Sequence, residues 1–209
     1  MTYRILLAFI IIYRIFLHNS AAQTINLSIV TLGDTEPKHL EIIKDSLQRF
    51  YNCKVINSYS LEISPELTSK SSKEDQLYNF EVLNAMAVNR RLNEFNKDTG
   101  GLIVGITDYA LTIGERFSST YYLIRGLAND SLGTATISTF RIKNESENDK
   151  DFVANLAKIA KHELGHLLGM PHCGSDSCLM VDGYRFNKMS RNYCKDCLNK
   201  IDPRHLIIE

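Results

Sequence analysis

The sequence lacks a surplus of charge of either sign, with 24 basic and 24 acidic residues among 209 and a formal net charge of zero. This balance gives no electrostatic reason to expect nucleic acid or an anionic membrane as a partner. Internal repeats and low-complexity tracts are absent too, which argues against repeat architectures and biased segments. Tryptophan is missing as well, and this absence excludes nothing. What remains is an ordinary globular composition, 44% apolar and 23% charged, for one domain or one domain of two lobes.

The apolar stretch at the N-terminus is too short for a comfortable membrane helix, which needs about 20 residues. It covers residues 5–17, is broken by Arg14, and is followed by small residues that end at Ala22. This layout predicts a secretory signal peptide over residues 1–22 and therefore an exported protein, with an uncleaved N-terminal anchor or a misread start codon as alternatives. The mature chain, 23–209, would enter a strand pattern almost at once, so we expect no inhibitory pro-segment.

Strand and helix patterns alternate through the first two-thirds of the chain, which predicts a mixed α/β (α+β) fold with a twisted sheet and packed helices. Strands are expected over residues 25–32, 53–63, 102–107, 121–127 and 134–142. Helices are expected over residues 37–50, 76–96 and 150–168, with a polar loop over 65–75. Beyond Gly169, which ends the last helix, the chain becomes irregular and rich in cysteine. We therefore expect an N-terminal lobe, 23–169, and a small C-terminal lobe, 170–209.

The segment 162–172, with the sequence HELGHLLGMPH, carries the chemistry. On a helix His162 and His166 are one turn apart and project from the same face, so their imidazoles can bind one metal ion. Gly169 lets the chain turn sharply, and His172 returns to supply a third nitrogen. Three nitrogen ligands with an open fourth position are the arrangement of a catalytic zinc ion.

Glu163 adjoins the first histidine and is expected to act as general base on a water molecule that zinc activates. A lone His-Glu-x-x-His is common, but Gly169 and His172 at fixed offsets reduce the probability of coincidence by a factor of about 400. We therefore predict a zinc-dependent peptidase acting on a peptide or protein substrate. The alternatives are an inactive zinc-binding interaction module, which the presence of Glu163 disfavours, and a zinc peptidase with a distant glutamate ligand, which His172 disfavours.

This motif resembles the metzincin clan of zinc peptidases, and the residues that follow it sharpen the match. They are Cys173, Cys178, Met180, Cys194 and Cys197. Their order is similar to the signature of the archaemetzincins, in which four cysteines surround a methionine. The resemblance covers roughly residues 25–198, with a specific signature only in the last third.

The resemblance implies that Met180 forms a methionine turn, packing beneath the histidines without binding zinc. It also implies a second, structural zinc ion held by the four cysteines, whose close pairs are metal-ligand spacing on their own terms. In an oxidising compartment the same thiols could form two disulfides instead. The 13-residue gap between Met180 and Cys194 is shorter than the usual family spacing, so we expect a smaller loop over the cleft.

Other residues carry weaker predictions. Cys53 is expected to be a small buried apolar residue, and Tyr184 to be a packing residue that does not bind an oxyanion. His39 and His205 are expected at the surface. The strand at 134–142 is either a sheet edge that pairs with an extended peptide or an internal strand. Cleavage specificity, aminopeptidase or endopeptidase action, and oligomeric state are left open by the sequence.

Overall fold

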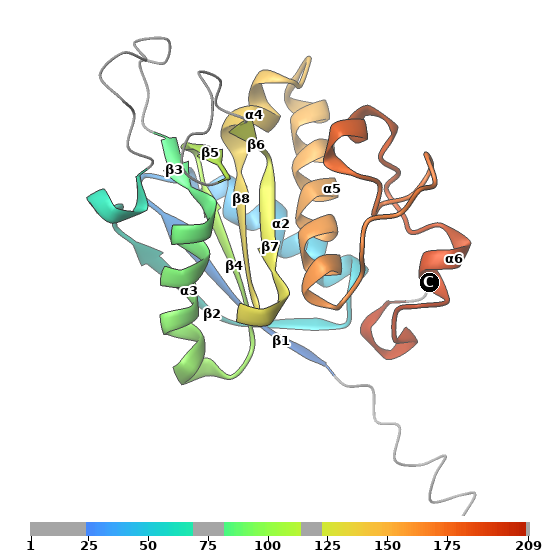
Figure 1. Ribbon diagram of the computed structural model, residues 1–209, viewed down its shortest axis with the longest axis horizontal. Helices are drawn as coiled ribbons and strands as arrows, with labels where there is room; N and C mark the ends of the chain where they lie inside the picture. Colours follow the sequence, from blue (N-terminus) through green and yellow to red (C-terminus); the bar gives the residue numbers. More distant parts are fainter. Residues whose placement is uncertain (1–23, 69–81, 114–122, 208–209) are drawn as a thin grey trace, which may run out of the picture.

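The computed structural model describes residues 24–68, 82–113 and 123–207 (Figure 1). The predicted signal peptide, 1–22, lies outside these residues and stays a prediction, which N-terminal sequencing of the mature protein tests. Within the described residues, no helix is long and apolar enough to cross a membrane.

A five-stranded sheet forms the centre of the fold (Figure 1). Its strands lie in the order β2 (Cys53–Leu61), β1 (Ile25–Leu32), β4 (Leu102–Thr107), β8 (Thr134–Ser138) and β7 (Gly126–Asn129). The first four strands are parallel, whereas β7 runs antiparallel to β8. Because β7 pairs with β8 alone among the described strands, it is an edge of the sheet. The mixed sheet expected from the sequence is confirmed.

Helices cover both faces of this sheet. α2 (Pro37–Phe50) and α5 (Asp149–Leu167) lie on one face, and α3 (Ala85–Thr99) lies on the other (Figure 1). Successive strand residues point to opposite faces. Ile29 belongs to the core against α2 and α5, whereas its neighbour Val30 belongs to the core against α3. The result is a sandwich of helix, sheet and helix layers with two apolar cores.

α5 matters most because it carries the motif. It begins after Asn148, whose side-chain oxygen accepts the backbone N–H of Asp151 at 3.0 Å, as an N-cap residue does. The acidic first turn also suits the positive end of a helix. The helix stops before Gly169, which has a φ of 82° in the left-handed region that favours glycine. The predicted helix and its glycine stop are confirmed.

The chain after α5 is irregular, with a kinked 3₁₀ segment at Gly183–Lys188, a single 3₁₀ turn at Pro203–His205 and the short helix α6 (Lys195–Leu198). Its buried side chains nevertheless join the core formed by α2 and α5, among them Met180 and Ile201. The two predicted lobes therefore share one hydrophobic core.

Two predicted elements were wrong in part because tertiary contacts decide them. The strand expected over 134–142 ends at Ser138, and Thr139–Asn144 forms the helix α4. The hydroxyl of Thr139 donates to the carboxylate of Asp108 at 2.5 Å, which anchors the start of that helix on the loop after β4. The local sequence alternates as a strand does, and the contact with Asp108 lies where the strand gives way to the helix.

The helix expected over 76–96 begins later, at Ala85. Val82–Asn84 forms the strand β3, which joins β5 (Ala110–Thr112) and β6 (Leu123–Ile124) in a separate three-stranded sheet. The side chain of Asn84 accepts the N–H groups of two following residues and so caps α3. Residues 76–81 lie outside the described part of the chain.

Four smaller predictions also change. The strand expected over 121–127 is divided between β6 and β7, which are separated by Arg125. The loop expected over 65–75 contains one turn of helix at Pro65–Leu67, and its residues from 69 on lie outside the described residues. His39 is buried and not at the surface, because its Nδ1 atom bonds to Asp108 at 2.8 Å. His205 is half-buried in the last helical turn.

Candidate active site

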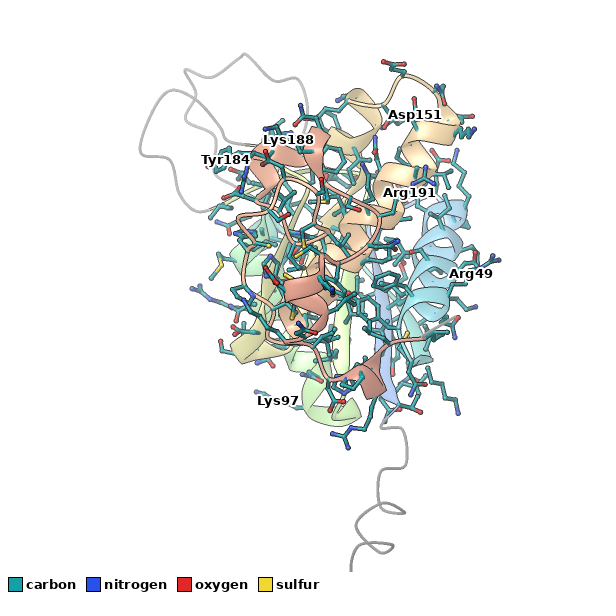
Figure 2. All side chains as sticks on the ribbon, turned by 90° about the vertical axis from the view of Figure 1, so that its right-hand side faces the viewer. Arg49, Lys97, Asp151, Tyr184, Lys188 and Arg191 are labelled. Carbon is teal, nitrogen blue, oxygen red and sulfur yellow. The ribbon has the colours of Figure 1, made fainter. Side chains whose placement is uncertain are left out.

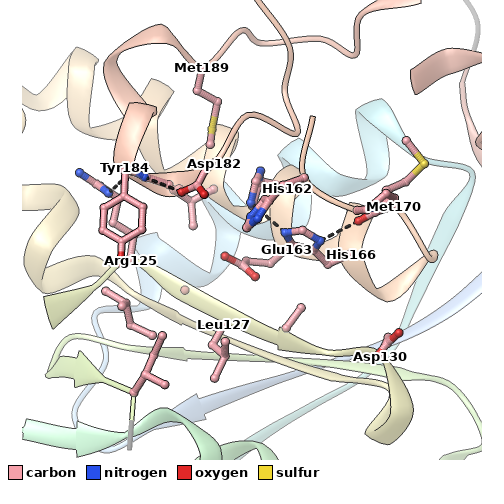
Figure 3. A pocket seen from close by; sticks show the side chains of 18 of the residues that line it. Arg125, Leu127, Asp130, His162, Glu163, His166, Met170, Asp182, Tyr184 and Met189 are labelled. Carbon is pink, nitrogen blue, oxygen red and sulfur yellow. Dashed lines mark hydrogen bonds between the residues drawn. The ribbon is translucent and has the colours of Figure 1, made fainter. Parts of the chain in front are cut away.

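The end of α5 faces a cavity of about 760 Å³ between β7 and the C-terminal lobe. The cavity is lined by His162, Glu163, His166 and His172 together with apolar side chains. Figure 3 shows Arg125 and Asp130 near its two ends, with the histidines between them. The elements that bring these residues together are the active-site helix, the edge strand of the sheet and the irregular chain beyond Gly169.

The three histidines form one cluster, in which a nitrogen atom of each lies within 4.8 Å of the others. The Nδ1 atom of His162 lies 2.8 Å from the carbonyl oxygen of Leu179, and that of His166 lies 2.7 Å from the carbonyl of Met170. Since a carbonyl only accepts hydrogen bonds, both Nδ1 atoms carry the proton. Each Nε2 atom of a neutral ring therefore presents a lone pair.

These two lone pairs face each other, because the Nε2 atoms of His162 and His166 are 3.0 Å apart. Two nitrogens bound to one tetrahedral zinc ion at about 2.0–2.1 Å lie about 3.3 Å apart. Burial, followed by the neighbouring His166, lowers the pKa of His162 to about 3, and burial lowers the pKa of His166. The rings are therefore neutral at physiological pH, and their geometry and protonation both fit a shared metal ion.

Glu163 is buried beside the edge strand, with only 5% of its surface exposed. Burial raises the pKa of its carboxyl group to about 8, although the backbone N–H of Ala128 donates to it and acts in the opposite direction. A cation at the histidines would favour the charged carboxylate again. A carboxyl group in this position can accept a proton during a reaction and release it afterwards.

Gly126 allows Glu163 to approach the strand this closely. A Cβ atom at Gly126 would lie 2.5 Å from Oε1 of Glu163, so any larger residue would displace the carboxylate. Gly126 was not among the residues predicted from the sequence. The available signal was a glycine inside a strand pattern, which often marks a close approach of another group.

Met180 is fully buried beneath the active-site helix. A Cβ atom at Gly165 would lie 2.7 Å from the sulfur of Met180 and 2.7 Å from the hydroxyl of Tyr193. The glycine of the His-Glu-Leu-Gly-His sequence thus leaves room for both side chains under the histidines.

The four C-terminal cysteines form a second cluster, with sulfur atoms within 4.8 Å of one another. All the cysteines of the chain are free thiols, and the sulfur atoms of Cys173 and Cys194 are 3.7 Å apart. Thiolates bound to a tetrahedral zinc ion at about 2.3 Å lie about 3.8 Å apart, whereas disulfide sulfurs lie about 2.05 Å apart. The backbone N–H of Cys197, which donates to its sulfur, lowers the pKa of Cys194 to about 7, which favours a thiolate. The thiol geometry therefore fits a metal ion.

Three further sequence predictions can be compared with the site. Tyr184 is 89% exposed at the mouth of the cavity and projects from the C-terminal lobe (Figure 2), so the expected packing role is wrong. The strand β8 is internal, and the edge beside the cavity is β7. Cys53 is half-buried against the main core, and burial raises the pKa of its thiol to about 11, as an unreactive cysteine requires.

Comparison with known proteins agrees with this geometry. The profile of peptidase family M54 matches residues 27–203. The archaemetzincin of Saccharolobus solfataricus is 26% identical over 183 residues, which cover 80% of this chain and 94% of that protein. The archaemetzincin of Pyrococcus furiosus is 28% identical over 189 residues, which cover 84% of this chain and 92% of that one.

Two crystal structures share the fold. The archaemetzincin of Archaeoglobus fulgidus, solved as a complex with malonate, superposes with a TM-score of 0.64 at 20% identity, covering 85% of this chain and all of that chain. The archaemetzincin of Methanopyrus kandleri superposes with a TM-score of 0.64 at 17% identity, covering 88% of this chain and 97% of that chain. Since the family profile matches most of the sequence, the chain belongs to peptidase family M54 and is a zinc-dependent metallopeptidase.

Proposed function

We propose that this peptidase holds its catalytic zinc ion with His162, His166 and His172, and that Glu163 is its general base. One observation carries the proposal: the Nε2 lone pairs of two histidines face each other at 3.0 Å, with the third histidine in the same cluster. The carbonyls that accept from the two Nδ1 atoms set the tautomer and the ring orientation, as partners of metal-bound histidines commonly do.

When bound, zinc polarises the scissile carbonyl and an attacking water molecule. The protein supplies the proton transfer: Glu163 accepts a proton from that water and passes it to the leaving amine. The backbone of Gly126 and the N–H of Ala128 hold the carboxylate in place. The unpaired side of β7 offers backbone groups to an extended peptide, which supports hydrolysis of peptides lying along this strand.

We further propose a structural zinc ion at the four cysteines, Cys173, Cys178, Cys194 and Cys197. The sulfur separation of 3.7 Å supports this proposal. Two backbone N–H groups, those of Met180 and Cys194, also donate to the sulfur of Cys178 at 3.4 and 3.3 Å and would stabilise a thiolate. Met180 would form an apolar floor under the histidines without binding either ion.

Elemental analysis of the wild-type protein and two variants tests the proposed site. The wild-type protein should contain two zinc ions, and His166→Ala should contain one, because only the histidine site loses a ligand. Glu163→Gln should keep both ions, since the amide replaces a group that does not bind metal. Its rate of hydrolysis of a peptide library should fall by about 10²–10⁴-fold, the usual loss for a missing general base.

Two results would contradict the proposal. Zinc content unchanged by His166→Ala would remove the three-histidine site. Full peptidase activity in Glu163→Gln would show that another group accepts the proton.

A further inference from the structure

The two clusters are joined by short stretches of backbone. Cys173 directly follows His172, and Cys178 directly precedes Leu179, whose carbonyl orients His162. One cysteine is therefore next to a histidine of the cluster, and the other is next to the residue whose carbonyl positions another histidine. A change in the backbone at the cysteines must reach the histidines.

The position of His172 depends strongly on this connection. Its ring is exposed and, within the described part of the chain, contacts the other two histidine rings without a hydrogen bond of its own. Its neighbour Cys173, in contrast, is held: its N–H donates to the carbonyl of Met180 at 2.7 Å. The backbone at Cys173 thus determines where the third imidazole lies.

The four cysteines lie on two arms of the chain, residues 173–178 and residues 190–197. The position of the Leu179 carbonyl depends on both arms. The N–H of Leu179 donates to the carbonyl of Asn192 at 2.8 Å, and the N–H of Ser190 donates to the carbonyl of Cys178 at 3.3 Å. These bonds join the arm with Cys178 to the arm that leads to Cys194. Four thiols from both arms converge, so a metal ion between them would fix the spacing of the arms.

The second arm also reaches the active-site helix. Tyr193 precedes Cys194, and its hydroxyl lies 2.5 Å from the hydroxyl of Tyr51. Tyr51 in turn donates to the backbone carbonyl of Lys161 at 2.6 Å, one residue before His162. The cysteine cluster is therefore connected to the histidines through His172, through Leu179 and through this pair of tyrosines.

We propose that the four-cysteine cluster is a positioning device for the catalytic centre: metal at the cysteines raises the zinc affinity of the three histidines. This inference rests on the two zinc sites proposed above. Its physical basis is conformational entropy. A metal ion at the cysteines orders the backbone that carries His172 and the Leu179 carbonyl, so these groups lose less freedom when the second ion binds at the histidines. By thermodynamic linkage, metal at the histidines must strengthen metal binding at the cysteines by the same factor.

The test measures metal affinity and not activity. Cobalt replaces zinc, because thiolate ligands give an intense near-ultraviolet band that imidazole ligands lack, so the two sites are distinguished by spectrum. Cys194→Ser removes a ligand from the arm that is remote from His172. It should lose the thiolate band, and competition with a chelator should show the histidine site weakened by about 10–100-fold, the usual effect of partners outside the first ligand shell.

Two control variants separate metal binding from substitution itself. Cys194→His replaces the half-exposed cysteine by another zinc ligand and should restore much of the affinity of the histidine site. Cys53→Ser changes a thiol on β2, outside the cluster, and should leave both affinities at their wild-type values.

The reciprocal measurement keeps the inference testable if Cys194→Ser does not fold. In His166→Ala the four cysteines are intact, and the inference expects their affinity for cobalt to fall by the same factor. Unchanged histidine-site affinity in folded Cys194→Ser, or unchanged cysteine-site affinity in His166→Ala, would overturn the coupling while leaving both proposed sites in place. A wild-type protein that binds cobalt at only one cluster would instead overturn the proposed pair of sites.

Discussion

At the scale of single residues, the proposed general base packs against a strand residue that has no side chain. Gly126 lies so close to Glu163 that a methyl group would stand 2.5 Å from the carboxylate. We expect Gly126→Ala to shift Glu163 and to lower the rate of peptide hydrolysis by about 10²-fold, the typical cost of misplacing a catalytic group by about 1 Å. Zinc content should stay at the wild-type value, because no ligand changes.

A matched glycine provides the control for that experiment. A Cβ atom at Gly174 would meet no other atom within 4 Å, and its φ is not in the left-handed region. Gly174→Ala should therefore leave hydrolysis unchanged. Equal activity in the two variants would show that the approach of Glu163 to the strand is not needed.

At the scale of elements, α5 links stability to the candidate site because it carries two of the clustered histidines and Glu163, the proposed general base. Its N-cap Asn148 lies at the opposite end from the motif, and its amide also donates to the carboxylate of Asp151 at 2.9 Å. Asn148→Ala should lower the free energy of unfolding by about 1 kcal/mol, measured by urea denaturation. Activity per folded molecule should not change, because the motif lies more than three turns away.

The residue before the cap serves as its control. Glu147 is exposed, and Glu147→Ala should alter the free energy of unfolding by less than about 0.5 kcal/mol. If both variants were equally stable, the capping bond would contribute nothing measurable to the helix.

At the scale of the whole molecule, the shared core makes the two lobes one folding unit. Tyr51 from the N-terminal lobe and Tyr193 from the C-terminal lobe meet in this core. We expect near-ultraviolet circular dichroism from these tyrosines and far-ultraviolet circular dichroism from the helices to report one coincident thermal transition. Removing metal with a chelator should lower its midpoint, since ions that bind only the folded state stabilise it.

Two observations would contradict this picture. Separate transitions for the two probes would show that the lobes unfold independently. A midpoint unaffected by the chelator would show that metal binding is not coupled to folding.

Local spacing accounts for what was predicted well. The four-residue interval between His162 and His166 places both on one face of any helix, and Gly169 ends a helix for reasons of backbone geometry. The order of histidines, cysteines and methionine was sufficient to indicate the family. None of these inferences needs knowledge of distant contacts.

The incorrect predictions share the opposite property. His39 is buried against Asp108 and Phe152, both far along the chain. Tyr184 is exposed because no element among the described residues covers it. The alternation that predicted a strand beyond Ser138 is overridden where the first residue of the helix α4 bonds to Asp108. Each of these outcomes depends on whether a segment distant in the sequence lies against the residue, and sequence spacing does not identify that.

The sequence by itself determined the metal-ligand residues to test, the helix that carries them and the family, because these follow from spacing along a regular element. Only the tertiary structure decided that β7 is the edge beside the cavity, that Gly126 makes room for Glu163, and that a backbone carbonyl next to Cys178 orients His162. The physical reason is that strand order and close backbone approaches arise from packing between segments far apart in the chain, where local periodicity carries no information.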